Sequence, residues 1–184
     1  MRDKMRRNSS AGFSLIETLV AIIVLAVGVL GLAAMLAASM AYMSTSKEDY
    51  IAQQKAAEAV ESIFTARNTG LKTWNSICNI GSPICPNGIF TANAMPLCDA
   101  GADGILGTAD DNCAIIDSLL TPGPDGKLGT ADDVLIPLGT YTRQITITAI
   151  PGNADLRQIA VTVTYISGRF NKSYTLTTNI SAFS

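Results

Sequence analysis

The sequence predicts an α+β fold, in which a long N-terminal helix packs on a C-terminal antiparallel β-meander. Two observations favour this fold. A mostly apolar run from Ala11 to Met43 continues into an amphipathic stretch, and three β-branched segments near the C-terminus alternate apolar and polar residues. Between them, residues 68–137 are rich in Gly, Pro, Asn and Asp, which predicts a loop-rich insert.

The apolar run is long enough to cross a membrane as a helix. Residues 13–43 carry a single charge, Glu17, and about 20 helical residues span a hydrocarbon core of ~30 Å. The leader, residues 1–12, carries four basic residues against Asp3. Because positive flanks stay in the cytoplasm, we expect the chain after residue 43 to cross to the other side.

The start of this run resembles the processing motif of type IV prepilins and pseudopilins. The residues that carry the resemblance are GFSLIE, residues 12–17, followed by an uncharged helix. The resemblance implies that a membrane peptidase cleaves between Gly12 and Phe13, removes residues 1–12 and methylates Phe13. It also implies that Glu17 pairs with the free N-terminal amine of a neighbouring subunit during fibre assembly.

Residues 25–33, LAVGVLGLA, resemble the PilV type of minor pilin in particular. The resemblance implies a pilin-like fold and a single-pass inner-membrane precursor with a periplasmic C-terminal domain. After assembly, the subunit would lie in a type IV pilus, or its initiating tip complex, at the cell surface. The implied partners are other pilin subunits, the prepilin peptidase, the inner membrane and the pilus assembly platform.

Two other functions stay open from the sequence. A minor pseudopilin of a type II secretion system would carry the same N-terminal motif. A secreted calcium-dependent binding module would instead lose the apolar run to signal peptidase and begin near Met40 or Ala41. The sequence also leaves open whether the subunit lies at the tip or along the shaft, and what it contacts outside the cell.

Composition argues against catalysis and against nucleic-acid binding. The chain has no histidine, which excludes Ser-His-Asp and Cys-His catalytic arrangements and His-ligated zinc, so we expect no enzyme. Loss of the leader removes four of the 13 basic and one of the 15 acidic residues, leaving 9 and 14 and a net charge of −5. An acidic chain has little attraction to nucleic acid.

Residues 44–67 are expected to continue the helix beyond the membrane. Apolar side chains recur at helical spacing, and Phe64 lies beside them, so that one stripe can pack on a sheet: Ala52, Ala56, Val60 and Ile63. Charged residues are expected on the other faces: Lys55, Glu58 and Glu61. Asn68 or Gly70 is a suitable C-terminal end of this helix. The alternative to one continuous helix is two helices with a break near Ser44.

The insert contains all four cysteines of the chain: Cys78, Cys85, Cys98 and Cys113. In an oxidising compartment they most simply form two disulfides, with three possible connectivities. We favour Cys78–Cys85 with Cys98–Cys113, because each pair closes a short loop, although the sequence does not decide this. A four-cysteine zinc site is the alternative, but the chain has no C-x-x-C pair.

The insert also contains an internal repeat. GADGILGTADD at residues 101–111 recurs as GPDGKLGTADD at residues 123–133, identical at nine of eleven positions. The Cys98–Cys113 pair would enclose the first copy. Two copies are too few for a solenoid, and they predict one local structure used twice.

The repeat raises the possibility of calcium binding. Counting Asp99 as position 1 of an EF-hand-type loop puts Asp103 at position 5, Gly104 at 6 and Asp110 at 12. The expected calcium ligands of the two copies are the following carboxylates: Asp99, Asp103, Asp110, Asp111, Asp125, Asp132 and Asp133. The alternative is that Asp-Gly only forms turns and that the aspartate pairs are solvated.

Three strands are expected in the last segment, residues 138–184. They cover residues 140–150, 159–165 and 174–180, where β-branched residues alternate with polar ones. Turn residues separate them at 151–155 and 167–169. The short connections predict an antiparallel meander.

Overall fold

The structure is a computed structural model that describes residues 14–183. The predicted cleavage residues, Gly12 and Phe13, lie outside the described residues. The chain divides into two compact units between Ser44 and Thr45. Each unit is described by itself below.

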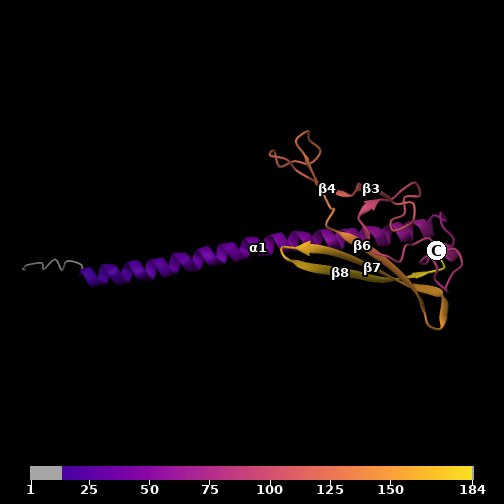
Figure 1. The fold of residues 1–184 in the computed structure, drawn as a ribbon, viewed down its shortest axis with the longest axis horizontal. Helices are drawn as coiled ribbons and strands as arrows, with labels where there is room; N and C mark the ends of the chain where they lie inside the picture. The colour runs from indigo at the N-terminus through magenta and orange to yellow at the C-terminus, as the bar shows by residue number, and fades with distance from the viewer. Residues whose placement is uncertain (1–13, 184) are drawn as a thin grey trace, which may run out of the picture. The chain divides into compact units, whose positions relative to one another are not determined.

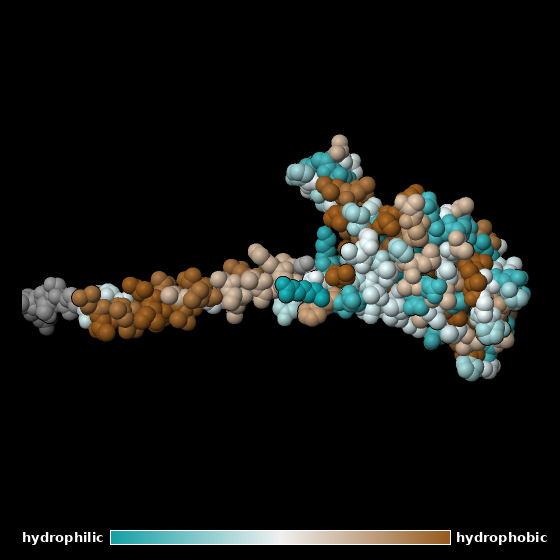
Figure 2. Space-filling view, viewed as in Figure 1, coloured by the Kyte–Doolittle hydropathy of each residue, from teal (hydrophilic) through white to brown (hydrophobic). Residues whose placement is uncertain are grey.

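The first unit is the apolar part of helix α1, which spans Leu15–Asn68. Between residues 15 and 43 every side chain is exposed, including Leu30 at 70 % and Leu36 at 63 %. Figure 2 shows this stretch as a nearly continuous apolar surface. By length and composition α1 can cross a membrane, as predicted. It shows no break near Ser44, so the alternative of two helices is wrong.

The second unit contains the rest of α1, a short 3-10 helix and eight strands. After α1 come η1 (Trp74–Ser76), β1 (Met95–Pro96), β2 (Cys98–Asp99), β3 (Asn112–Ile116), β4 (Ser118–Thr121), β5 (Val134–Pro137), β6 (Thr142–Ile150), β7 (Asn153–Ser167) and β8 (Phe170–Ser181). The main sheet has the antiparallel order β1-β6-β7-β8, while β2-β3 and β4-β5 form two-stranded ribbons (Figure 1).

The core lies between α1 and the main sheet. Along α1 the buried stripe includes Ala52, Ala56 and Ile63, as predicted, while Val60 and Phe64 are only partly buried. Alternate residues of β6 and β7 face this stripe, as period-two strands require: Ile145, Ile147, Ile159, Val161 and Val163. The short alanine side chains leave room for these larger β-branched ones.

The main sheet corrects the predicted three-stranded meander. A fourth strand, β1, comes from the loop-rich insert and pairs with Arg143 and Thr142 of β6. It is held there because the next residue, Leu97, is fully buried in the core. A two-residue strand of Met and Pro has no β-pattern in the sequence. Its pairing depends on the burial of Leu97, which the sequence alone does not reveal.

Two of the three predicted strands, β7 and β8, extend beyond their predicted ends, whereas β6 begins at Thr142, two residues later than predicted. β7 starts at Asn153 and β8 at Phe170, so the two turns shrink to Pro151–Gly152 and Gly168–Arg169. Ladder hydrogen bonds to a neighbouring strand hold polar residues that have little β-propensity of their own. The hairpins are therefore tighter than composition indicates.

The cysteines form the favoured disulfides. Cys78 bonds to Cys85, and Cys98 bonds to Cys113 around the first repeat copy, with Cα–Cα distances of 6.4 and 4.7 Å. A four-cysteine zinc site is thereby excluded. The insert has more regular structure than predicted, because η1 and strands β1 to β5 all lie within it.

A buried asparagine completes the edge of β6 beyond the short strand β1. The side chain of Asn79 donates to the carbonyl of Ile145 at 2.8 Å and accepts from the amide of Ile147 at 2.7 Å. Asn79 is only 8 % exposed. A carboxamide offers one donor group and one acceptor in the spacing of a strand backbone, so this one side chain replaces the missing ladder bonds.

We predict that Asn79→Ala lowers the free energy of unfolding by about 2 kcal/mol, because it leaves a buried amide and a buried carbonyl of β6 unpaired. Urea unfolding of the full chain in detergent, followed by the fluorescence of the single tryptophan, Trp74, measures this. Asn179→Ala, on the exposed face of β8, is the control and should change stability by less than ~0.5 kcal/mol. Equal effects of the two variants would contradict the edge role of Asn79.

Candidate assembly segment and twin acidic loops

Glu17 lies in the first turn of α1, at the start of the apolar segment. The turn is closed by bonds from the Glu17 amide to the Ser14 carbonyl at 3.0 Å and from the Thr18 hydroxyl to the Leu15 carbonyl at 2.8 Å. Among residues 14–183, no basic side chain forms an ion pair with Glu17. A carboxylate on an apolar helix is costly in a membrane, and a cation from another chain would relieve this cost.

The two repeat copies adopt the same hydrogen-bonded loop. In the first copy the Asp103 carboxylate accepts from the Ile105 amide at 2.9 Å, and in the second Asp125 accepts from the Lys127 amide at 2.8 Å. The last aspartate of each copy accepts from a glycine amide: Gly107 to Asp111 at 2.7 Å, and Gly129 to Asp133 at 2.6 Å. The predicted use of one local structure twice is confirmed.

A threonine hydroxyl joins the adjacent aspartates in each loop. Thr108 lies 2.6 Å from an oxygen of Asp110 and 3.1 Å from one of Asp111. Thr130 lies 2.7 Å from the equivalent oxygen of Asp132. The hydroxyl bond lowers the pKa of Asp110 and likewise that of Asp132. These carboxylates therefore stay charged while they organise the loop.

Glycines are required where the loops turn. Gly104 and Gly126 have φ of +68° and +70°, a left-handed conformation that costs other residues energy. At Gly101 and Gly123 an added Cβ would collide with the backbone carbonyl of Asp110 or Asp132. This explains why both glycine positions recur in the repeat.

The first copy is built into the folded unit. Ile105 is 1 % and Leu106 is 7 % exposed. Lys72 pairs with Asp103 at 3.0 Å. Arg143 lies 4.0 Å from Asp111, and the side chains of Arg143 and Asp111 are almost fully buried. Burial raises the pKa of Asp111, although hydrogen bonds from the amides of Gly107 and Thr108 oppose this rise. Burial lowers the pKa of Arg143.

The second copy projects from the β4-β5 ribbon (Figure 1). Leu128, the equivalent of Leu106, is 63 % exposed, and Lys127 replaces the buried Ile105. Within the described residues its three carboxylates form no ion pair. Two of the three carboxylates of the first copy are thus paired with protein cations, whereas within the described residues none of the second copy is.

The predicted calcium ligands are only partly brought together. Asp103 and Asp110 line one pocket beside Lys72, and the Asp103 amide lies 3.4 Å from an Asp110 oxygen. Asp99, the predicted first ligand, lies on β2 and lines a different pocket. Among the described residues, no group of three His, Cys, Asp or Glu side chains is arranged to hold a metal ion.

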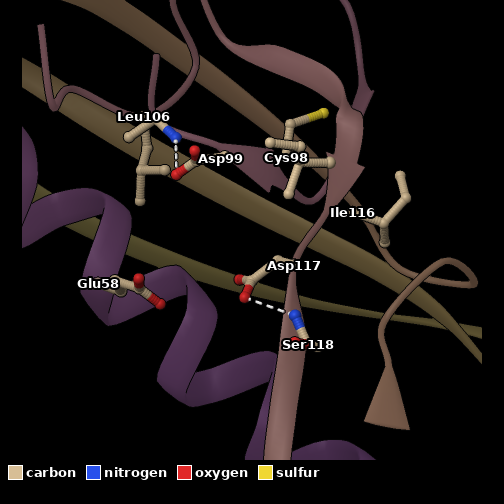
Figure 3. Close-up of a pocket in the computed structure, with 9 residues that line it drawn as sticks. Glu58, Cys98, Asp99, Leu106, Ile116, Asp117 and Ser118 are labelled. Atoms are coloured by element: carbon tan, nitrogen blue, oxygen red, sulfur yellow. Dashed lines mark hydrogen bonds between the residues drawn. The ribbon is translucent and has the colours of Figure 1, made fainter. Parts of the chain in front are cut away.

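The pocket that contains Asp99 is acidic (Figure 3). Glu58 from α1 and Asp117, between β3 and β4, also line it. Lys55 reaches both, at 2.8 Å from Glu58 and 2.6 Å from Asp117. Burial acts to lower the pKa of Lys55, but the hydrogen bonds with Asp117 and Glu58 outweigh this effect, and the pKa is raised. The Lys55 side chain is only 12 % exposed, and its ion pair with Asp117 ties α1 to the segment between β3 and β4.

Sequence reasoning missed the residues that hold the first loop in place. Arg143 shares the buried face of β6 with Ile145 and Ile147, and this period-two position is the signal that could have marked it as a buried cation. Lys72 carries no such signal.

A second buried arginine, Arg157 on the buried face of β7, was also missed. It stacks 4.0 Å over the Trp74 ring and donates to the Ile77 carbonyl at 2.7 Å.

Comparison with known proteins gives one family match. Residues 7–33 match the family described as "Prokaryotic N-terminal methylation motif". No curated protein and no solved structure matches the chain. The N-terminal segment is therefore similar to that of type IV pilin-like precursors, and the match does not extend into the folded unit.

Proposed function

We propose that the protein is a minor pilin of the PilV type, cleaved between Gly12 and Phe13 and assembled through α1 into a type IV pilus. The observation that carries the proposal is the methylation motif at residues 7–33, which leads directly into a helix whose apolar side chains have no partner within their own unit. Such a surface needs lipid before assembly and neighbouring subunits afterwards.

Glu17 supplies the specificity of this assembly. Its carboxylate has no internal partner among the described residues, and cleavage would create one new cation, the amine of Phe13. Pairing between subunits neutralises both charges, and loss of one member of a buried ion pair typically costs ~3–5 kcal/mol. The pair would fix the axial position of one helix against the next.

The folded unit fits an oxidising location outside the cytoplasm. Both disulfides lie in it, and they staple an insert whose buried side chains join the main core instead of forming one of their own. Disulfides form in the periplasm and outside the cell. This agrees with an inner-membrane precursor whose domain is periplasmic, and with a surface position after assembly.

The alternatives differ at the mature N-terminus and in location. A pseudopilin of a type II secretion system would share the methylated N-terminus but remain in the envelope. A secreted calcium-dependent module would start near Met40 or Ala41. Mass spectrometry of sheared surface fibres separates the pilin from the other two, because only a pilin would be found there with N-methylated Phe13. The N-terminal residue of the mature protein then separates the pseudopilin from the secreted module.

The cleavage site gives the first test of the proposal. In cells that express the peptidase, we predict a mature N-terminus at methylated Phe13, whereas Gly12→Val blocks cleavage because a β-branched side chain replaces the smallest residue. Uncut precursor should accumulate in the membrane and be visible as a larger band on a gel. Ala11→Val is the matched control and should be processed. Normal cleavage of Gly12→Val would contradict the assigned site.

Glu17 gives the second test. We predict that Glu17→Ala is inserted and cleaved normally but is incorporated into fibres at a level reduced by roughly tenfold or more, since even ~1.4 kcal/mol of lost pairing changes an equilibrium tenfold. Glu61→Ala removes an exposed carboxylate from the same helix outside the apolar segment and should have no effect. Quantitative immunoblots of sheared fibres measure this, and wild-type incorporation of Glu17→Ala would exclude the assembly role.

Calcium binding is proposed for the acidic loops, and first of all for the second copy. Adjacent carboxylates in a compact loop repel one another unless a cation lies near. Lys72 and Arg143 meet this need in the first copy, whereas no described basic residue does so in the second. Modules outside the cell bind calcium at about 10⁻⁴–10⁻³ M, and calcium would then order the exposed ribbon.

We predict that calcium titrated into the chelated full chain in detergent gives a binding heat at millimolar concentration, and that Asp125→Ala abolishes it. Asp103→Ala, the matched change in the first copy, should keep this heat because Asp103 is already paired with Lys72. Magnesium serves as the ion control, since it prefers a tighter octahedral site. The absence of any heat with calcium would rule out binding by either loop.

A further inference from the structure

The turn between β7 and β8 is tied to the first residues of the folded unit. The Ser167 hydroxyl lies 3.3 Å from that of Thr45, and the Tyr165 hydroxyl donates to Asp49 at 2.5 Å. Lys172 adds an ion pair with Asp49 at 3.5 Å. These contacts come from both sides of the turn and hold that end of the sheet against residues 45–49 of α1 (Figure 1).

The tip of this hairpin exposes apolar surface that the fold does not use. Phe170 is 74 % and Ile166 is 49 % exposed. Gly168 and Arg169 form the turn between them and are exposed as well. Within the described residues, Arg169 forms no ion pair. A phenyl ring, an aliphatic chain and a guanidinium without an ion pair among the described residues thus lie at one end of the hairpin. Phe170 is paired with Ser167 and Ile166 with Asn171, so the two apolar side chains lie on opposite faces of this end.

The position of the tip along the chain points to what covers it. The apolar segment ends at Met43, and Tyr42, beside it, is 77 % exposed, as in the aromatic belts of membrane helices. If the apolar segment spans the membrane as proposed, the membrane surface meets the chain close to Thr45, to which the tip is bonded. This follows from the connection of the chain alone, whatever direction the apolar segment takes.

We propose that the β7-β8 turn is a membrane-surface anchor of the unassembled subunit, with Phe170 and Ile166 inserted among lipid headgroups and Arg169 on their phosphates. The inference rests on the proposed membrane-inserted precursor. An apolar wedge with a flanking cation is the combination that binds at a lipid interface, and the exposed Lys47 adds a second cation on α1. Release of this anchor would then accompany extraction of the subunit into a fibre.

Depth-dependent quenching tests the anchor in the full chain. The native tryptophan is first replaced by Trp74→Phe, which keeps an aromatic ring under Arg157. Phe170→Trp is then compared with Phe183→Trp, an equally exposed position at 72 %. The Phe183 carbonyl is bonded to Arg67, about 33 Å along α1 from Thr45. The variants are reconstituted into vesicles of equal parts phosphatidylcholine and phosphatidylglycerol, with or without brominated acyl chains.

We expect brominated lipid to quench Phe170→Trp by roughly half and to leave Phe183→Trp unchanged, because only the first lies at the interface. Ile166→Trp repeats the test at a second position of the tip, and near-wild-type melting shows that each variant is folded. If the chain resists alkaline extraction but neither tip variant is quenched, the anchor is overturned and the proposed membrane precursor stands. If the chain is extracted, both are overturned.

A neighbouring subunit is the other possible occupant of the tip. It would leave Phe170→Trp unquenched in dilute vesicles and shift its emission as the ratio of protein to lipid rises. That result would overturn the lipid anchor in favour of a contact between subunits. Quenching that is constant across this ratio supports the lipid surface.

Discussion

The folded unit depends on the packing of one stripe of α1 against the main sheet. Ala52, Ala56 and Ile63 are fully buried against the inward-facing residues of β6 and β7. The insert adds to this core with Phe90, Leu97 and Ile105 instead of forming its own. The docked first loop and the edge of β6 are positioned by contact with this core.

In the twin loops, the local sequence determines the internal hydrogen bonds, and the surrounding structure determines burial and ion pairing. The carboxylates, the threonine and the glycines form the same hydrogen bonds in both copies, because these bonds join residues within one loop. Ile105 and Leu106 bury the first copy beside Arg143 and Lys72, whereas Lys127 and Leu128 leave the second in solvent. One motif therefore serves as a structural module in one place and presents a charged, exposed surface in the other.

Assembly and the membrane anchor are proposed for two surfaces that the core leaves uncovered, and calcium binding for a third, the second acidic loop. In the proposed function, the apolar segment of α1 would be covered by lipid and later by other subunits, and Glu17 would select how those subunits meet. The β7-β8 turn lies where this segment ends and would contact the same membrane. In the proposed assembly, both surfaces would exchange lipid for protein when the subunit leaves the membrane.

The sequence by itself determined the elements whose patterns are local. Hydropathy defined the apolar helix and alternation defined β6 to β8, while the motif at residues 12–17 predicts the processing site. The short loops between cysteines also favoured the disulfides that the structure shows. Only the tertiary structure decided that β1 joins the sheet, that Asn79 completes the β6 edge, and that Asp99 lies apart from Asp103. These features depend on contacts between residues far apart in the chain, and such contacts have no period or spacing that a sequence can display.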